Sequence, residues 1–346
     1  MTKDILFIAD VKNSAIATST RQWKNIIGGD VIYCADFVSP VNLLKTIVRK
    51  NPNTILFTWR GGLREILEDP KSTEFLQTNL INSKILFSVP DSVGLRSISS
   101  EAQLFKFADG VTVVSEKLLN QYSELYQDED LPYFILRDLP DLNLIDKLNL
   151  RIQKRKNQVI WVGNSKWGER LGYSDHKGYK RFIQPIFVKL RHLDPSLKTI
   201  SIDRGKKFVP LERTLEAIRS SKFLLQFSDS EGTGLPIIES CGLGTIPITR
   251  DIGVAKELLQ GNLQNLIVST AEEAVKRIFE LRNTELHSVL IDSYDRYIKG
   301  CKESIKSINL DCVAIRVTKR TNYRVKKNLK NYFLVRSRWV YRYFKN

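Results

Sequence analysis

The sequence predicts an α/β fold arranged as two successive layered domains with a basic C-terminal tail. Short runs of β-branched and aromatic residues recur along the chain, and several lack polar alternation, as expected of parallel strands covered on both faces. Stretches with helical spacing separate these runs. A polar and basic segment interrupts the series, after which a second series begins. Strand alternating with helix, twice over, is typical of two α/β domains.

Residues 1–150 are expected to form the first domain. Val41 to Lys50 and Glu116 to Tyr126 have helical spacing. The predicted strands are 5–9, 30–34, 54–59, 84–89, 110–114 and 133–136.

Residues 151–300 are expected to form the second domain, after an interdomain linker over 138–157 that contains Pro140 and ends in a basic run. Two successive α/β series predict two Rossmann-like domains facing a cleft, with ligands at the carboxyl ends of the strands. The strands are predicted at 158–163, 198–202, 222–227, 245–249 and 265–268. The helices are predicted at 178–193, 211–220, 271–282 and, as a short helix, from Pro236.

The charge lies mainly in the third predicted segment, the tail 301–346. Residues 313–346 contain eleven Lys or Arg and no Asp or Glu, so they hold +11 of the net +16 and leave +5 to the rest. This distribution argues against a uniformly basic protein that coats nucleic acid. Over 325–346 the apolar and aromatic residues fall on one helical face opposite the basic ones, which predicts an amphipathic helix on an anionic membrane. The alternative is packing of this helix onto the first domain.

Membrane-spanning and disulfide-stapled classes are not expected. No apolar run approaches the roughly 18 residues that a membrane span needs, and the amino terminus does not have the pattern of a secretory signal. The four cysteines have no paired spacing, so they are predicted to be reduced thiols in a cytoplasmic protein. They are Cys34, Cys241, Cys301 and Cys312. The amphipathic tail further predicts that this protein is peripheral on the inner face of the cell membrane.

The most informative segment is 228–249, which follows a buried strand run. Gly232 and Gly234 permit backbone torsions that side chains would block, and Pro236 suits the first turn of a helix. Free amides at that helix start would bind a phosphate or diphosphate. Glu231 and Glu239 flank it, and each carboxylate can accept hydrogen bonds from two vicinal hydroxyls. The pattern therefore indicates a nucleotide-sugar site, the alternative being a solvated Glu231 and a Glu239 that only favours the helix start.

This segment resembles the E-x7-E signature of retaining glycosyltransferases of the GT-B fold, family 4 above all. The stretch from Glu231 to Glu239, followed by Gly244-Thr-Ile-Pro247, matches the family pattern at most positions. Thr233 stands where an aromatic residue is usual and Ser240 where an alanine is usual. Further similarity covers most of 1–283: it includes 108–122, 136–142, 159–179 and the helix and strand that precede Glu231.

The resemblance implies roles for individual residues. Lys177 would contact the donor diphosphate, Glu239 the ribose and Glu231 a hydroxyl of the transferred sugar. Asn164 stands where relatives commonly have an arginine, so Lys166 or Arg170 would supply the second positive charge, and solvated loops are the alternative. The residues expected to contact the donor are Gly163, Lys166, Lys177, Gly232, Gly234, Leu235, Pro236 and Glu239.

Asp91 is a further candidate catalytic residue, because it follows a predicted strand near where many relatives carry a histidine. Pro90 and Asp91 are also ordinary turn formers.

The histidines do not cluster at metal-ligand spacing, and Asp128, Glu129 and Asp130 are expected to be a solvated loop. No metal and no cofactor besides the nucleotide-sugar donor are therefore expected, with lysine and helix amides stabilising the leaving diphosphate.

The family resemblance and the candidate residues together predict the function. It is retaining, metal-independent transfer of a sugar from a nucleotide donor to a glycan or lipid-linked acceptor, in cell-surface polysaccharide synthesis. The alternatives are a nucleic-acid-binding protein that uses the basic tail, although no RNP, helix-turn-helix or KH signal accompanies it, and an inactive GT-B assembly partner. The base, the sugar, the acceptor and the linkage stay open.

Overall fold

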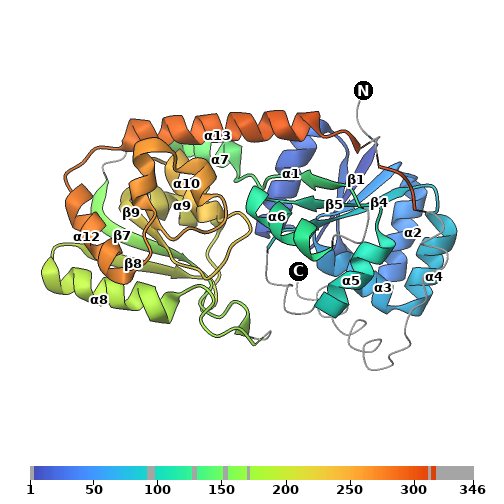
Figure 1. Ribbon diagram of the computed structural model, residues 1–346, viewed down its shortest axis with the longest axis horizontal. Helices are drawn as coiled ribbons and strands as arrows, with labels where there is room; N and C mark the ends of the chain where they lie inside the picture. Colours follow the sequence, from blue (N-terminus) through green and yellow to red (C-terminus); the bar gives the residue numbers. More distant parts are fainter. Residues whose placement is uncertain are drawn as a thin grey trace. The chain divides into compact units, whose positions relative to one another are not determined.

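The computed structural model describes the chain in segments that form two compact units (Figure 1). The first unit takes the described residues within Met1–Leu139 and Cys301–Asn346, and the second is Pro140–Gly300. The described residues are 4–91, 98–126, 131–150, 155–169, 172–310 and 313–316, with only the backbone described at 98–101.

The first unit is built on a parallel sheet in the order β2-β1-β3-β4-β5-β6. Its strands are almost wholly apolar and their central members are buried along their whole length, as the runs without alternation predicted. The strands are β1 (Ile5–Ala9), β2 (Asp30–Tyr33), β3 (Thr54–Phe57), β4 (Lys84–Val89), β5 (Gly110–Val113) and β6 (Tyr133–Ile135).

Helices connect these strands, and polar side chains fix where several of them begin. Ser14, Ser39 and Ser115 each accept a hydrogen bond from a backbone amide three residues later, which caps α1, α2 and α6. The helices are α1 (Ala15–Ile27), α2 (Pro40–Lys50), α3 (Arg60–Glu68), α4 (Pro70–Asn79), α5 (Ile98–Phe107) and α6 (Glu116–Leu125), with a 3-10 turn, η1 (Cys34–Asp36).

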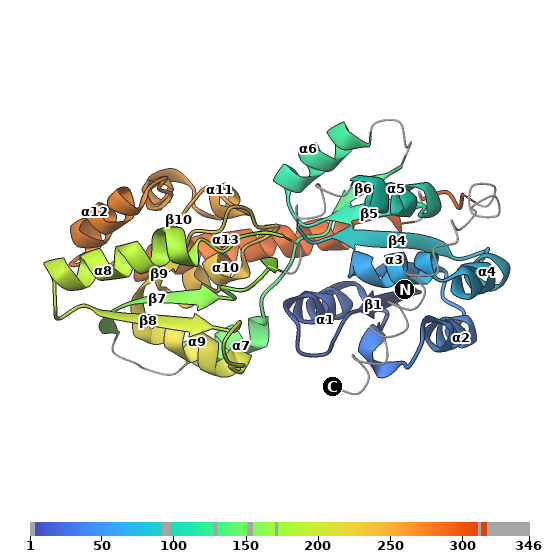
Figure 2. The ribbon, with the colours of Figure 1, turned by 90° about the horizontal axis from the view of Figure 1, so that it is seen from below.

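The second unit is built on a smaller parallel sheet in the order β10-β9-β7-β8. Because all the strands are parallel, their carboxyl ends lie along one edge and their amino ends along the other. Figure 2 shows helices on both faces of this sheet. The strands are β7 (Lys156–Gly163), β8 (Lys198–Asp203), β9 (Ser221–Gln226) and β10 (Ile246–Thr249).

On the faces of this sheet α8 contacts α12, and α9 contacts both α7 and α10. The order of the strands and right-handed crossovers place α8 on one face and α9 and α10 on the other. The helical segments are α7 (Leu142–Asn149), η4 (Tyr179–Ile183, a π turn), α8 (Gln184–Leu193), α9 (Leu211–Ser220), α10 (Leu235–Gly242), α11 (Ala255–Leu258), η5 (Gly261–Leu266, 3-10), α12 (Ala271–Leu281) and α13 (His287–Ser307).

Two segments differ from the sequence prediction. The expected linker contains α7, whose start is capped by Asp141 accepting from the Leu144 amide at 3.1 Å. The expected strand at 265–268 is wrong: Gly261–Leu266 forms a 3-10 turn, and Ile267 makes an isolated bridge to Thr249. A single bridge cannot extend the sheet, so the apolar residues there pack as a turn.

The C-terminal part of the chain returns to the first unit at Cys301, within α13. Lys84 Nζ donates to the Leu310 carbonyl at 2.8 Å, and the Arg316 amide donates to Asp109 Oδ1 at 2.7 Å. The predicted amphipathic helix over 325–346 lies outside the described residues. Among the residues that are described, no helix combines the length and the apolar character that crossing a bilayer requires.

Three cysteines, Cys34, Cys241 and Cys301, are buried, and none of them forms a disulfide within the described residues. Burial raises the pKa of the Cys241 thiol far above its usual range, so the group stays protonated. Cys312 lies outside the described residues.

Candidate functional site

The candidate site lies at the carboxyl edge of the second sheet. β7 ends at Gly163 and β9 at Gln226, and the loop that follows β9 carries Glu231 before α10 begins at Leu235. Parallel pairing of β7 with β9 and of β9 with β10 brings these strand ends together. The sequence predicted this placement of the loop correctly.

The structure brings Lys177 and Glu231 together. Lys177 Nζ lies 2.6 Å from Glu231 Oε1, and the side chains of Lys177 and Glu231 are 16% and 15% exposed. Ser228 Oγ and Gln226 Nε2 also donate to Oε1, at 2.6 and 3.1 Å. Three donors therefore converge on one carboxylate oxygen. In the described part of the chain no group donates to the other oxygen, Oε2.

This environment keeps Glu231 ionised. Burial by itself would raise the pKa of the carboxyl, but the charge and hydrogen bond of Lys177 and the hydrogen bond from Ser228 outweigh it and lower the pKa below 4.5. Lys177 in turn lies over the ring of Trp167, with Nζ 4.9 Å from the centroid. The pair is a fixed negative charge beside a fixed positive one.

A tight turn positions Lys177. Gly178 has φ 65°, and a Cβ there would lie 2.2 Å from the Phe227 carbonyl oxygen, so only glycine fits. Asp175, which has φ 50°, accepts from the amides of Lys180 and Arg181 at 2.9 Å each. The turn therefore packs against the end of β9, and this close approach holds Lys177 beside the loop of Glu231.

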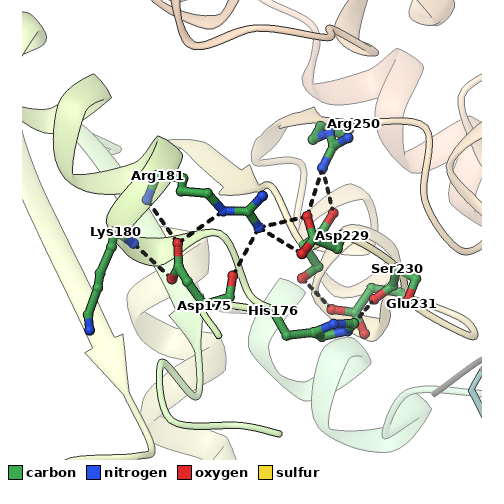
Figure 3. A network of polar contacts seen from close by, with 9 residues as sticks. Asp175, His176, Lys180, Arg181, Asp229, Ser230, Glu231 and Arg250 are labelled. Atoms are coloured by element: carbon green, nitrogen blue, oxygen red, sulfur yellow. Dashed lines mark hydrogen bonds and ion pairs between the residues drawn. The ribbon is translucent and has the colours of Figure 1, made fainter. Parts of the chain in front are cut away.

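A second ion-pair network braces the same loop (Figure 3). Arg181 Nη2 lies 2.7 Å from both oxygens of Asp229, and Arg250 Nη1 lies 3.5 Å from Oδ1. The Asp229 amide donates to the His176 carbonyl at 2.8 Å. Two residues before Glu231, the loop is thus tied to both neighbouring segments.

His176 lies beneath this loop as a neutral ring. Burial, followed by the charge of Lys177, lowers its pKa, and its Nε2 lies 3.1 Å from the Ser230 carbonyl. A neutral imidazole that carries its proton on Nε2 donates this bond. Sequence reasoning missed this role because a lone histidine carries no spacing signal.

The start of α10 has the predicted form. Gly234 has φ 78° and caps the helix without any side-chain hydrogen bond, and Pro236 lies in the first turn. Gly232 and Leu235 lie in the same segment. A helix start that lacks a side-chain hydrogen bond to its first amides leaves those amides for an anion to bind.

Glu239 lies on α10 and is 6% exposed. Burial raises the pKa of its carboxyl to about 7, although the charge of Arg204 opposes this shift. No hydrogen bond or ion pair reaches the carboxylate from the residues that the structure describes. Such a group is suited to accept hydrogen bonds from a ligand.

The second positive charge expected from Lys166 or Arg170 stays a prediction. The side chain of Lys166 is exposed, while its backbone amide donates to Asn164 Oδ1 at 3.0 Å and its carbonyl accepts from the Glu169 amide at 3.2 Å. Arg170 lies outside the described residues. Arg204, directly after β8, donates its amide to the Gly163 carbonyl at 2.8 Å and exerts its charge on Glu239. Its place directly after a strand was the sequence signal for it.

Asp91 lies in the first unit, two residues after the end of β4, and Arg60 binds it. Arg60 Nη2 lies 2.9 Å from Asp91 Oδ1, and Nη1 donates to the Asp91 carbonyl at 3.0 Å. Arg60 is only 13% exposed. The two-point contact fixes both the backbone and the carboxylate.

No group of three or more His, Cys, Asp or Glu in the described residues could hold a metal ion. Asp128, Glu129 and Asp130 lie outside those residues.

Comparison with known proteins identifies the fold. No protein-family model matches the chain, and no curated protein matches it in sequence. Several solved structures are similar to it. HepE of Anabaena, in complex with UDP-glucose, is 13% identical with a TM-score of 0.56, and the match covers 87% of this chain and 96% of that one.

Sucrose-phosphate synthase from Thermosynechococcus elongatus gives 13% identity, the same coverages of 87% and 96%, and a TM-score of 0.55. The pneumococcal O-GlcNAc transferase GtfA, in complex with UDP and GlcNAc, is 12% identical with a TM-score of 0.50, and the match covers 81% of this chain. The chain spans 60% of the length of GtfA. At these identities the likeness establishes the architecture. The chain has the GT-B fold of two Rossmann-like units, as the sequence predicted.

Proposed function

We propose that this protein is a retaining glycosyltransferase of the family 4 type, which moves a sugar from a nucleotide-diphosphate donor to an acceptor hydroxyl. One observation carries the proposal. At the carboxyl edge of the second sheet, Lys177 contacts Oε1 of the largely buried Glu231 carboxylate and keeps this group ionised. The other oxygen of Glu231, Oε2, receives no donor from the described residues. A carboxylate arranged in this way suits a sugar hydroxyl.

The donor would lie along this edge. Glu239 would accept from the ribose hydroxyls, and the amides around Gly234 and Leu235 would bind the phosphates at the start of α10. Lys177 has three N–H donors, of which Glu231 takes one, so the others are available to diphosphate oxygens. We assign the second positive charge to Arg204, in place of the arginine that relatives carry where this chain has Asn164. Gly163 ends β7 at this edge beside the proposed donor, and a Cβ there would lie 2.4 Å from the Trp161 ring.

The reaction would need no protein nucleophile. The bond between C1 of the sugar and the diphosphate oxygen breaks, and a bond from C1 to the acceptor oxygen forms on the same face. The acceptor proton passes to an oxygen of the leaving diphosphate. Lys177 and the helix amides would stabilise the charge that grows on that group, so the chemistry would not require a metal ion.

Uridine is the base to test first. HepE and GtfA were solved with UDP, and HepE with UDP-glucose. The acceptor would be a glycan or a lipid-linked glycan of a cell-surface polysaccharide. Asp91, fixed by Arg60, would contact the acceptor hydroxyl or the donor sugar.

Thermal unfolding with UDP, GDP, ADP and CMP tests the donor site. We expect one nucleotide, UDP first, to raise the melting temperature of the wild type and of Lys189→Ala, an exposed lysine on α8, but not that of Lys177→Ala. Stabilisation should persist in EDTA. If no nucleotide stabilises the protein, or if Lys177→Ala responds like Lys189→Ala, the proposed site is wrong. If stabilisation or turnover requires Mn²⁺ or Mg²⁺, the metal-independent mechanism is wrong.

A further inference from the structure

A second pocket of about 890 Å³ lies at the opposite, amino-terminal edge of the same sheet. Lys156, the first residue of β7, lines it, whereas the candidate donor site lies beyond Gly163, the last residue of that strand. Eight residues of strand at about 3.3 Å each separate the two edges by roughly 25 Å. The pocket is therefore distinct from the donor site.

Arg155 and His287 form a fixed wall of this pocket. Arg155 Nη2 donates to the Leu243 carbonyl at 2.6 Å and lies 2.9 Å from His287 Nδ1, while Nη1 donates to Thr245 Oγ1 at 3.3 Å. Gly244 leaves room for both side chains, because a Cβ there would lie 1.8 Å from His287 Nδ1 and 2.8 Å from Arg155 Nη2. The glycine that follows the E-x7-E segment thus shapes this pocket.

The lining is predominantly cationic. Lys156, Arg219, Lys222 and Arg282 join Arg155, against the carboxylates of Asp194 and Glu285. Lys222 donates to the backbone carbonyl of Arg282, and Arg155 hydrogen-bonds to the Thr245 hydroxyl and the Leu243 carbonyl, which are uncharged groups. Burial, followed by the charge of Arg219, lowers the pKa of Arg155, although Glu285 raises it. Arg155, Arg219 and Lys222 are half-buried, whereas Lys156 and Arg282 are exposed. A bound anion would offset the excess of positive charge that lines the pocket.

We propose that this pocket binds a polyvalent oxyanion of the phosphate class, such as a phosphorylated small molecule, independently of the donor site. Guanidinium and ammonium groups that line one pocket from β7, β9 and the residue after α12 suit an anion with several oxygens and more than one negative charge. The volume exceeds that of a lone phosphate and fits a ligand the size of a sugar phosphate.

Titration of pyrophosphate into the full chain by calorimetry, at low salt without phosphate buffer, tests the proposal. The decisive variant is Lys222→Gln with Arg282→Gln. Lys189→Gln with Lys276→Gln is the matched control, since both of these lysines are exposed and neither lines the pocket. The basic tail is the same in all variants. Arg282 is exposed, so Arg282→Gln alone keeps the test available if the pair fails to fold.

We expect the pocket pair to raise the Kd for pyrophosphate by about tenfold or more, and the control pair to change it by less than about twofold. Lys177→Ala should keep the pyrophosphate binding at this pocket, which Lys222→Gln with Arg282→Gln should lose. This expectation holds even if the proposed glycosyltransferase function is wrong. An unchanged Kd in the pocket pair, or an equal loss in the control pair, overturns the site. Tighter binding of citrate than of pyrophosphate overturns the phosphate class.

Discussion

Glu239 is a buried carboxyl whose pKa is raised to about 7. Between pH 4.5 and 7 the folded state holds a proton that the unfolded state has lost, so stability falls as pH rises through this window and stays reduced above it. Glu239→Gln, which mimics the protonated form, should therefore exceed the wild type in unfolding free energy by about 1–3 kcal/mol at pH 8. The two should be nearly equal at pH 5.

The same substitution should weaken donor binding by about tenfold, because a neutral amide loses the charge-assisted bonds to the ribose. Urea unfolding at both pH values and nucleotide titration measure the two effects. A stability difference that is the same at pH 5 and pH 8 would show that Glu239 is not the group responsible.

Lys177 and Glu231 form a largely buried ion pair, so each depends on the other. Lys177→Met leaves Glu231 buried without its counter-charge and should cost about 2–4 kcal/mol in unfolding free energy. The pair Lys177→Met with Glu231→Gln should cost less than the sum of the single changes. Because the folded pKa of Glu231 is lowered, its stabilisation is present above pH 4.5 and is lost as the pH falls below that value. Urea unfolding of all four forms closes this cycle, and additive costs would argue against a coupled pair.

At the scale of elements, the turn at Asp175–Gly178 sets the position of Lys177. Gly178→Ala should lower the unfolding free energy by about 2–4 kcal/mol, because the new Cβ would clash with the Phe227 carbonyl and the positive φ would strain the backbone of an alanine. Gly261→Ala is the matched control: its φ is also positive, at 58°, but nothing lies within 4 Å of a Cβ there. It should cost about 1 kcal/mol. Equal melting temperatures for the two variants would contradict this account of the turn.

Elements were predictable from sequence to different degrees. The strands that run through both sheets were found because burial on both faces leaves unbroken apolar runs, as in β1 and β4. The run at 265–268 is also apolar, but it meets only the last residue of β10, through a single bridge between Ile267 and Thr249, and local pattern cannot reveal how far a pairing extends. Helix α7 was missed because its polar, basic context resembles a linker.

The site was predictable where a motif fixes the spacing and not where tertiary contact decides. The loop with Glu231 and the start of α10 were located correctly from their glycines and proline. The contacts of Arg181, Arg204 and Arg250 come from three separate strand ends or turns that only the folded sheet brings to one edge. Lys166 is close in sequence to the end of β7, but its ammonium is exposed and contacts neither Glu231 nor Glu239.

At the scale of the whole molecule, we propose that the basic segment 318–346, which lies outside the described residues, holds the protein on an anionic membrane surface. Each positive charge near such a surface adds about 1 kcal/mol of attraction. Deletion of 318–346 should abolish flotation with anionic liposomes at low salt and leave nucleotide binding unchanged. Failure of the full chain to float would remove the membrane proposal without affecting the donor site.

The central claim, that the carboxyl edge of the second sheet activates a nucleotide sugar, is tested most directly by the rate at which the protein releases nucleoside diphosphate from sugar nucleotides, UDP-glucose first. We expect release from at least one donor, slowed by about 100-fold in Lys177→Ala and unchanged in Lys189→Ala. No release from any uridine, guanosine, adenosine or cytidine sugar nucleotide, or a rate that Lys177→Ala leaves intact, would contradict the claim.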